Sequence, residues 1–246
     1  MNKIISFLVF HVFIFTTTLS LLSAASGTIH DSGGTKLLRG IPYYILPLLR
    51  SSGGGLTLTR NTKDACPLNV TQESFEVNYG SPFTFTPIVL DEEIVRGAYP
   101  VSIEADVANP CHGSNIWKVT TASAAKDDDN DELLTNNIKD KKKKEDDKQG
   151  VLEHIVTTGG EFNKPESCFQ IVEDDVMPGL RSYQIQHCPF KCGSQSTDLA
   201  CYNVGIVRDA DGKGYLGRTD AIYPVVFMNC LGTFSQSVKI SRFSAE

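Results

Sequence analysis

The chain has 246 residues, which at roughly 150 residues per domain allows one large domain or two small ones. Hydrophobic residues make up 41% of it and charged residues 21%, which excludes a wholly disordered, collagen-like or multi-span membrane protein. The formal net charge is -6 and no strong basic face is evident, so a nucleic-acid partner is not expected.

The first 25 residues have the pattern of a secretory signal peptide. Lys3 gives a short basic start, residues 4–15 are almost uninterruptedly apolar, and Ser23 and Ala25 are small residues that suit cleavage after Ala25. The mature chain is then expected to begin near Ser26 and to be secreted. A single signal-anchor helix is the competing interpretation. No second transmembrane segment follows, so no membrane association is expected once the signal is removed.

Short β-type runs separated by Gly, Pro and Asp make up the rest of the chain, without a sustained helical periodicity. Several runs alternate apolar and polar side chains, as strands with one wet face do. The sequence therefore predicts an all-β domain, a sandwich or a barrel, with turns at residues 53–55 and 209–212. The predicted strands are residues 43–45, 56–59, 83–86, 101–105, 116–119, 169–172, 183–185, 204–207 and 225–227.

A charged insertion at about 123–150 interrupts this pattern. Residues 126–148 are almost devoid of aromatic and β-branched side chains and include three consecutive aspartates and four consecutive lysines. Such a segment cannot bury apolar area, so we expect a solvated, disordered loop within a single domain of residues 26–246. The lysine run resembles a heparin patch or a nuclear signal, but the flanking acidic residues offset its charge. Residues 231–246 form a separate tail.

Seven cysteines in an exported chain predict disulfides, and the odd number leaves at least one cysteine outside them. They lack the paired short spacings of a structural zinc site, so no metal is expected. Asp209 and Asp211 come nearest to a calcium loop, but Lys213 stands where a ligand is needed, and a hairpin turn is predicted there. The one sequon, Asn69-Val70-Thr71, predicts an N-glycan on Asn69.

Catalytic motifs are absent from the sequence. It contains no nucleophile elbow, no His-Glu-x-x-His, no phosphate-cradling Gly loop and no Cys-x-x-Cys. The histidines of the mature chain, His30, His112, His154 and His187, are scattered, and each is interpreted as a surface or core residue. Neither an enzymatic activity nor a cofactor is expected.

One set of spacings is specific enough to identify a family. Residues Ile29, Asp31, Gly34, Leu37, Tyr43 and Ile45 have the spacing of the amino-terminal signature of plant Kunitz-type (soybean trypsin inhibitor-like) proteins, with Thr35 as the one departure. The resemblance continues at residues 43–47, 53–58, 66–68, 116–119, 157–160, 188–189 and 201–206, and it is closest to the miraculin-like branch.

The resemblance implies a β-trefoil of twelve strands, six closing a short barrel and six forming hairpins that cap it. It also implies disulfides Cys66–Cys111 and Cys188–Cys201. Cys168, Cys192 and Cys230 fall outside that framework. Any two of these three could bridge, and a disulfide-linked dimer is the alternative to the expected monomer. The expected compartment is the apoplast, with the vacuole as the alternative.

In trypsin-inhibiting relatives, a rigid loop between the fourth and fifth strands presents a Lys or Arg to the protease. The corresponding loop here is residues 89–97, and its candidate contact residues are Leu90, Asp91, Glu92 and Glu93. Asp91 is near the primary specificity position, where a carboxylate would face the acidic floor of a trypsin-type pocket. A shift of one residue would instead present Leu90 to an apolar pocket. Placing Arg96 there would need a shift of about five residues.

Two functions follow from the resemblance. The favoured one is a secreted inhibitor of a serine, cysteine or aspartic protease other than trypsin. The alternative is a trefoil without inhibitory activity that acts as a carbohydrate- or protein-binding module, a storage protein or a defence protein.

Overall fold

The computed structural model describes residues 27–60, 65–89, 91–120, 154–193 and 197–231. The predicted signal peptide, the charged insertion, Leu90 and the tail after Leu231 lie outside the described residues. Within those residues, no helix is long and apolar enough to cross a membrane.

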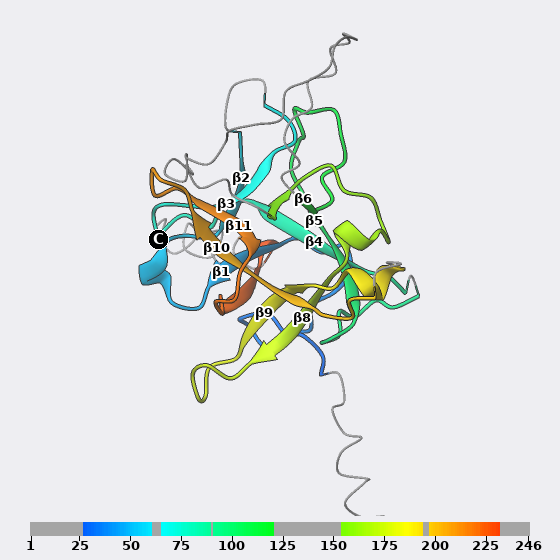
Figure 1. Ribbon diagram of the computed structural model, residues 1–246. Coiled ribbons are helices and arrows are strands. Elements are labelled where there is room, and N and C mark those ends of the chain that lie inside the picture. The colour runs from blue at the N-terminus through cyan, green and yellow to red at the C-terminus, as the bar shows by residue number, and fades with distance from the viewer. Residues whose placement is uncertain (1–26, 61–64, 90, 121–153, 194–196, 232–246) are drawn as a thin grey trace, which may run out of the picture.

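Strands dominate the described chain (Figure 1). They are β1 (Tyr43–Pro47), β2 (Leu56–Thr59), β3 (Asn69–Gln72), β4 (Pro82–Pro87), β5 (Pro100–Ala105), β6 (Lys118–Thr120), β7 (Ile155–Thr157), β8 (Phe169–Asp174), β9 (Ser182–His187), β10 (Tyr202–Arg208), β11 (Gly214–Arg218) and β12 (Val225–Asn229). Three short 3-10 turns accompany them: η1 (Arg50–Ser52), η2 (Pro165–Ser167) and η3 (Pro189–Cys192).

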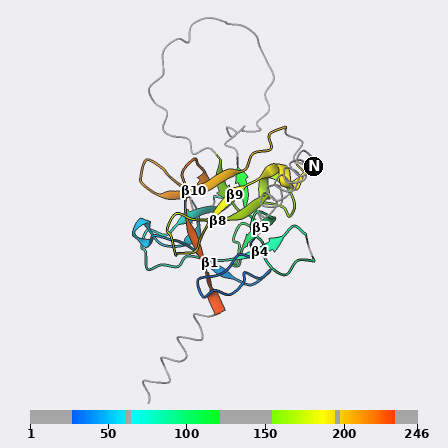
Figure 2. The same cartoon turned by 90° about the horizontal axis from the view of Figure 1, so that it is seen from below.

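Six of the strands close into an antiparallel barrel. Strand β1 pairs with β4, β4 with β5, β5 with β8, and β8 with β9. Strand β12 pairs with both β9 and β1, so the sheet returns to its beginning. Figure 2 shows several of these strands from below. Closure leaves these strands without an exposed edge along their paired parts.

The barrel interior follows directly from the alternation in the sequence. Each barrel strand points two side chains, at positions i and i+2, into the core. These buried residues are Tyr43, Ile45, Phe83, Phe85, Val101, Ile103, Phe169, Ile171, Tyr183, Ile185, Val225 and Phe227. The rings of Phe85 and Phe227 meet edge to face with centroids 5.2 Å apart. Trp117 packs in the same way on Phe83, at 5.0 Å.

The other six strands form three hairpins, β2–β3, β6–β7 and β10–β11. Their inner strands β3, β7 and β11 pair with one another. Two barrel strands and one hairpin therefore recur three times along the chain. This is a β-trefoil, and the predicted fold is confirmed.

The turn at residues 209–212 closes the β10–β11 hairpin, as predicted. The Asp209 carboxylate accepts hydrogen bonds from the backbone N–H groups of Asp211 (3.0 Å) and Lys213 (2.9 Å). One of its oxygens is thus committed to its own turn, as in an Asx-turn. No group of three or more His, Cys, Asp or Glu residues that could hold a metal occurs in the described part of the chain.

Candidate functional site

The loop between β4 and β5 has an exposed turn as its first part. At its base, the Ile88 N–H donates to the Pro100 carbonyl at 3.0 Å. Farther out, the Glu92 N–H donates to the Val89 carbonyl at 3.2 Å. Val89 is 54% exposed, and Asp91 and Glu93 are also exposed. Leu90, the remaining predicted contact residue of this loop, lies outside the described residues.

The second part of the loop, residues 93–97, is held against the amino-terminal segment of residues 27–39. Isolated β-bridges join Leu38 to Ile94 and Thr28 to Arg96. Backbone hydrogen bonds of 2.8–3.1 Å run between the two segments, namely Arg39 N to Glu93 O, Val95 N to Leu37 O, Ile29 N to Val95 O and Gly97 N to Gly27 O. Among the described contacts, Val89, Asp91 and Glu92 have no such pairing with the amino-terminal segment.

The amino-terminal segment is itself built to hold this shape. Asp31 is 8% exposed, and its Oδ1 accepts hydrogen bonds from the N–H groups of Gly33 (2.9 Å) and Thr35 (2.8 Å). That turn folds the segment back so that Ile29 and Leu37 are both buried in the core cluster, together with Val95 of the loop. Four of the six signature residues, Ile29, Asp31, Gly34 and Leu37, therefore belong to the segment that supports the loop.

Charges on the loop are mostly negative, and its one cation is engaged. The Arg96 Nε lies 3.2 Å from the Glu92 Oε2, and both side chains are about 40% exposed. The Arg96 backbone forms a β-bridge with Thr28. Moving the loop by about five residues, so that Arg96 reached the primary specificity position, would break this bridge. The exposed turn therefore presents acidic side chains and Val89.

Three disulfides lie around the barrel. Cys66 is joined to Cys111 and Cys188 to Cys201, which are the pairs that the resemblance implies, with Cα–Cα distances of 5.7 and 4.3 Å. The third joins Cys168 to Cys192 at 5.8 Å. Cys230 is the cysteine left outside the disulfides, and burial raises the pKa of its thiol to about 11.

Asn69 lies within β3, between β2 and the inner strands of the cap. Its side chain is 6% exposed, and neighbouring Val70 and Thr71 are fully buried. A glycan would require this side chain to leave the sheet. Glycosylation of Asn69 stays a prediction, which requires the glycan to be attached before the strand is buried.

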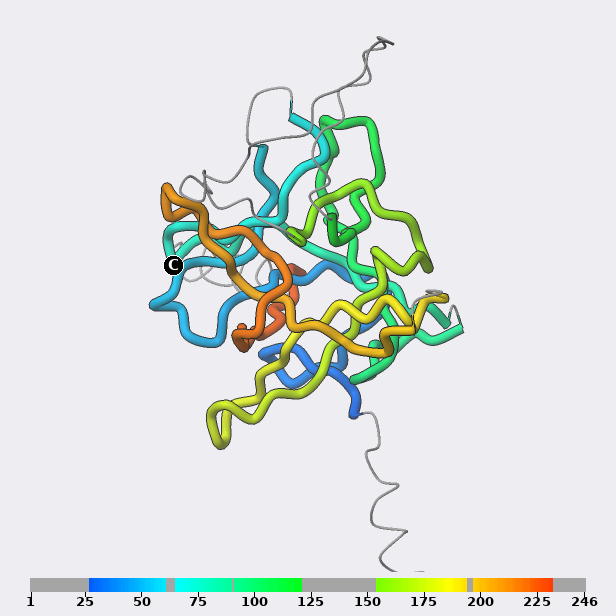
Figure 3. The backbone as a smooth tube through the Cα atoms, viewed as in Figure 1, coloured from blue at the N-terminus to red at the C-terminus, as the bar shows by residue number. Residues whose placement is uncertain are grey.

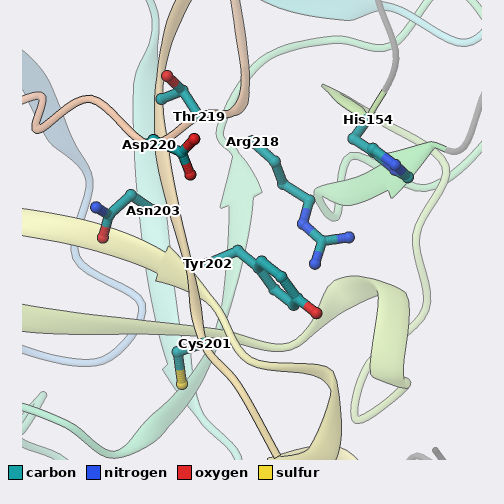
Figure 4. A pocket seen from close by; sticks show the side chains of 7 residues that line it. All are labelled: His154, Cys201, Tyr202, Asn203, Arg218, Thr219 and Asp220. Carbon is teal, nitrogen blue, oxygen red and sulfur yellow. The ribbon is translucent and has the colours of Figure 1, made fainter. Parts of the chain in front are cut away.

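A shallow pocket of about 560 Å³ lies at β10 and β11 (Figure 4). Its lining residues are His154, Cys201, Tyr202, Asn203, Arg218, Thr219 and Asp220. The Arg218 Cζ stacks 3.2 Å from the Tyr202 ring centroid. Among the described contacts, no lining side chain hydrogen-bonds another lining side chain.

Two features of the loop support were invisible as local sequence signals. The residues that hold residues 93–97 come from a segment about 60 positions earlier, and nothing in the loop's own composition indicates this pairing. The pairing of Cys168 with Cys192 was equally open. The sequence left three cysteines unassigned, Cys168, Cys192 and Cys230, and only the fold shows which two of them lie close enough to bond.

Comparison with known proteins places these features in a family. Residues 29–229 match the sequence model of the legume Kunitz family, described as trypsin and protease inhibitors. Miraculin of Synsepalum dulcificum is 29% identical over 85% of this chain and 86% of its own. Kunitz trypsin inhibitor 5 of Arabidopsis thaliana is 28% identical over 83% and 86%.

Among solved structures, Alocasin, a protease inhibitor from giant taro (Arum macrorrhizon), is 26% identical. It superposes with a TM-score of 0.60, covering 82% of this chain and 99% of its own. Members of this family are protease inhibitors rather than enzymes. The chain belongs to the plant Kunitz-type family of protease inhibitors, and within it to the miraculin-like branch.

Proposed function

We propose that the mature chain is a secreted protease inhibitor and that the β4–β5 loop of residues 89–97 is the segment it presents to its target, with Leu90, Asp91, Glu92 and Glu93 as the contact residues. The observation that carries this proposal is the hydrogen bonding of residues 93–97 to the amino-terminal segment. A loop already fixed in one shape loses little conformational entropy when it docks, so an interface of ordinary size can bind tightly.

The target that fits the turn is a protease other than trypsin. Asp91 is exposed, and a carboxylate placed in a pocket with an acidic floor would be desolvated beside a like charge. Leu90 is the residue that would suit the apolar pocket of a chymotrypsin-like enzyme. We expect the protein to act as a monomer in the apoplast.

The test is a titration of the purified mature chain against active-site-counted trypsin, chymotrypsin, and papain-, subtilisin- and pepsin-like proteases. The loop variant is Leu90→Ala/Asp91→Ala. Its matched control is Asp175→Ala/Val176→Ala, which removes an exposed acidic and apolar pair from the β8–β9 hairpin. We expect stoichiometric inhibition of one non-trypsin enzyme, abolished by the loop variant and kept by the control.

A substitution can also test the register of the loop. If Asp91 occupies the primary specificity position, Asp91→Lys should create trypsin inhibition where the wild type has little or none. Inhibition that survives the double loop substitution would place the contact on another loop. Absence of inhibition across the panel would favour the alternative, a trefoil that binds a carbohydrate or protein partner or serves in storage or defence.

A further inference from the structure

The ammonium group of Lys191 lies at the foot of the β4–β5 loop. Its Nζ donates to the Ala98 carbonyl at 2.7 Å and to the Gln170 Oε1 at 2.5 Å. Figure 3 shows the chain around η3, which carries Lys191, running beside the end of this loop. Lys191 thus joins a turn near residue 190 to a loop nearly one hundred positions earlier.

Ala98 is a residue that needs such support. Its φ is 59°, in the left-handed region that residues with a Cβ seldom adopt. A conformation of this kind persists only where the surroundings hold it. The Ala98 N–H donates to the Ile171 carbonyl at 2.8 Å, so with Lys191 on the carbonyl both polar groups of the residue are fixed.

Lys191 is in turn held by a chain of side-chain amides across three strands. The Gln170 Nε2 on β8 donates to the Gln186 Oε1 on β9 at 2.6 Å. The Gln186 Nε2 donates to the Asn203 Oδ1 on β10 at 3.0 Å. Because the amide nitrogen of Gln170 is engaged by Gln186, its oxygen faces Lys191. Gln170 is only 6% exposed, so water competes little at its side-chain amide.

The third disulfide fixes the turn that carries Lys191. Cys192 follows Lys191 directly, and its partner Cys168 lies two residues before Gln170. The disulfide therefore links η3 to the beginning of β8, beside both groups that Lys191 contacts. Cys188, at the start of η3, is joined to Cys201.

We propose that Lys191 is a positioning residue for the β4–β5 loop and that the Cys168–Cys192 disulfide holds it in place. Lys191 acts through the Ala98 carbonyl at the loop's carboxyl end, directly after Gly97, the last residue that the amino-terminal segment supports. The consequence for inhibition rests on the proposed function, whereas the effect on the loop itself does not.

A merely stabilising surface lysine would behave differently. Lys191 also lies 6.0 Å from the Phe190 ring centroid, a contact that could stabilise η3 without involving the loop. In that case its loss would leave loop exchange unchanged or raise exchange throughout the barrel. A positioning role predicts that loosening is confined to the loop.

Amide hydrogen exchange of the mature chain separates these cases. Lys191→Met keeps most of the side chain's length and removes the ammonium. Lys164→Met, at an exposed lysine of another loop, is the matched control. We expect amides of residues 93–99 to exchange about tenfold faster in Lys191→Met. Exchange in β10–β12 should change far less than exchange in the loop. Unchanged loop exchange, or an increase throughout the barrel, would overturn the proposal.

Two further variants test the disulfide. Cys168→Ala/Cys192→Ala should raise loop exchange as Lys191→Met does, while Cys66→Ala/Cys111→Ala should leave residues 93–99 unaffected although it opens the larger covalent loop. The reverse pattern would contradict the proposed role of the disulfide. Where the wild type inhibits a protease, Lys191→Met should weaken inhibition about tenfold and speed cleavage of the loop. Where it inhibits none, the exchange data still decide the role of Lys191.

Discussion

His187 is buried at the end of β9 and packs against the Phe169 ring, with centroids 5.4 Å apart. Its Nε2 lies 3.0 Å from the Pro165 carbonyl of η2, an arrangement that a neutral imidazole satisfies by donating from Nε2. Its Nδ1 is buried without a hydrogen-bond partner among the described residues. Burial lowers the pKa of this histidine to about 4, with Arg218 and His154 adding like charge.

This histidine should make folding sensitive to acid. Above pH 6.5 the imidazole is neutral in both the folded and the unfolded chain, so its contribution is fully present. Between pH 6.5 and about 4 only the unfolded chain takes up the proton, so the free energy of unfolding falls as the pH falls, by on the order of 3 kcal/mol. Denaturant unfolding of His187→Gln should lack this slope. His112→Asn, at an exposed histidine, should keep it.

Cys230 should be a poor site for covalent dimerisation. Since burial raises the pKa of its thiol to about 11, only roughly one thousandth is thiolate at pH 8, and the thiolate is the reactive form. We expect iodoacetamide to label the folded chain roughly a hundredfold more slowly than the unfolded chain. A non-reducing gel should show a monomer for both the wild type and Cys230→Ser. A dimer band that Cys230→Ser removes would contradict this expectation.

At the scale of elements, the turn at Asp31 is the support whose loss is easiest to measure. Asp31→Ala leaves two backbone N–H groups without their acceptor, which should lower the free energy of unfolding by about 1–3 kcal/mol. Exchange at residues 93–97 should rise as well, because this turn places the segment that pairs with them. Asp31→Asn keeps an oxygen in the same position and should lose much less. Equal losses in both variants would point to the charge rather than to the turn.

Alternation predicted the barrel strands because their side chains divide cleanly into buried and wet. All six barrel strands overlap predicted ones, and β2, β6 and β10 were also located, with β6 two residues later than expected at its start. The missed strands were β3, β7 and β11, the inner strands of the cap. They bury polar residues such as Asn69 and Thr71, and β11 contains two glycines, so none has an apolar stripe.

The position of the β4–β5 loop was predictable, but its construction was not. The resemblance located residues 89–97 between the fourth and fifth strands, where the structure also has an exposed turn. Its supports, however, come from residues 27–39 and from Lys191, which approach only when the barrel closes. Pairing between distant segments leaves no periodic trace in a single sequence, because each partner is an ordinary polar or apolar residue in its own surroundings.

At the scale of the whole molecule, the closed barrel brings together the separate segments that support the β4–β5 loop. Strands β4 and β5 define the ends of the presented loop, β8 supplies the Ile171 carbonyl and Gln170 at its foot, and β12 closes the barrel beside β1. The Ser32 N–H donates to the Phe227 carbonyl of β12 at 2.7 Å, so the supporting segment is tied to the closing strand too. The loop's geometry therefore depends on barrel closure.

Phe227 gives a direct test of that dependence. Its ring contacts Phe85 of β4 at 5.2 Å and Tyr183 of β9 at 5.5 Å, so it fills the core where the last strand closes the barrel. Phe227→Ala should lower the free energy of unfolding by about 3–5 kcal/mol, since it leaves a cavity among aromatic rings. Phe75→Ala removes the same side chain from a site that is 71% exposed and should change it by less than about 0.5 kcal/mol.

Denaturant unfolding followed by both Trp117 fluorescence and exchange at residues 93–97 measures the effect. Trp117 is fully buried in the core cluster, and the loop amides report the supported segment. If loop geometry depends on closure, both probes should shift together in Phe227→Ala and neither should shift in Phe75→Ala. A core transition that moves while the loop amides keep their wild-type protection would mean that the amino-terminal segment and Lys191 suffice to hold the loop without a fully packed barrel.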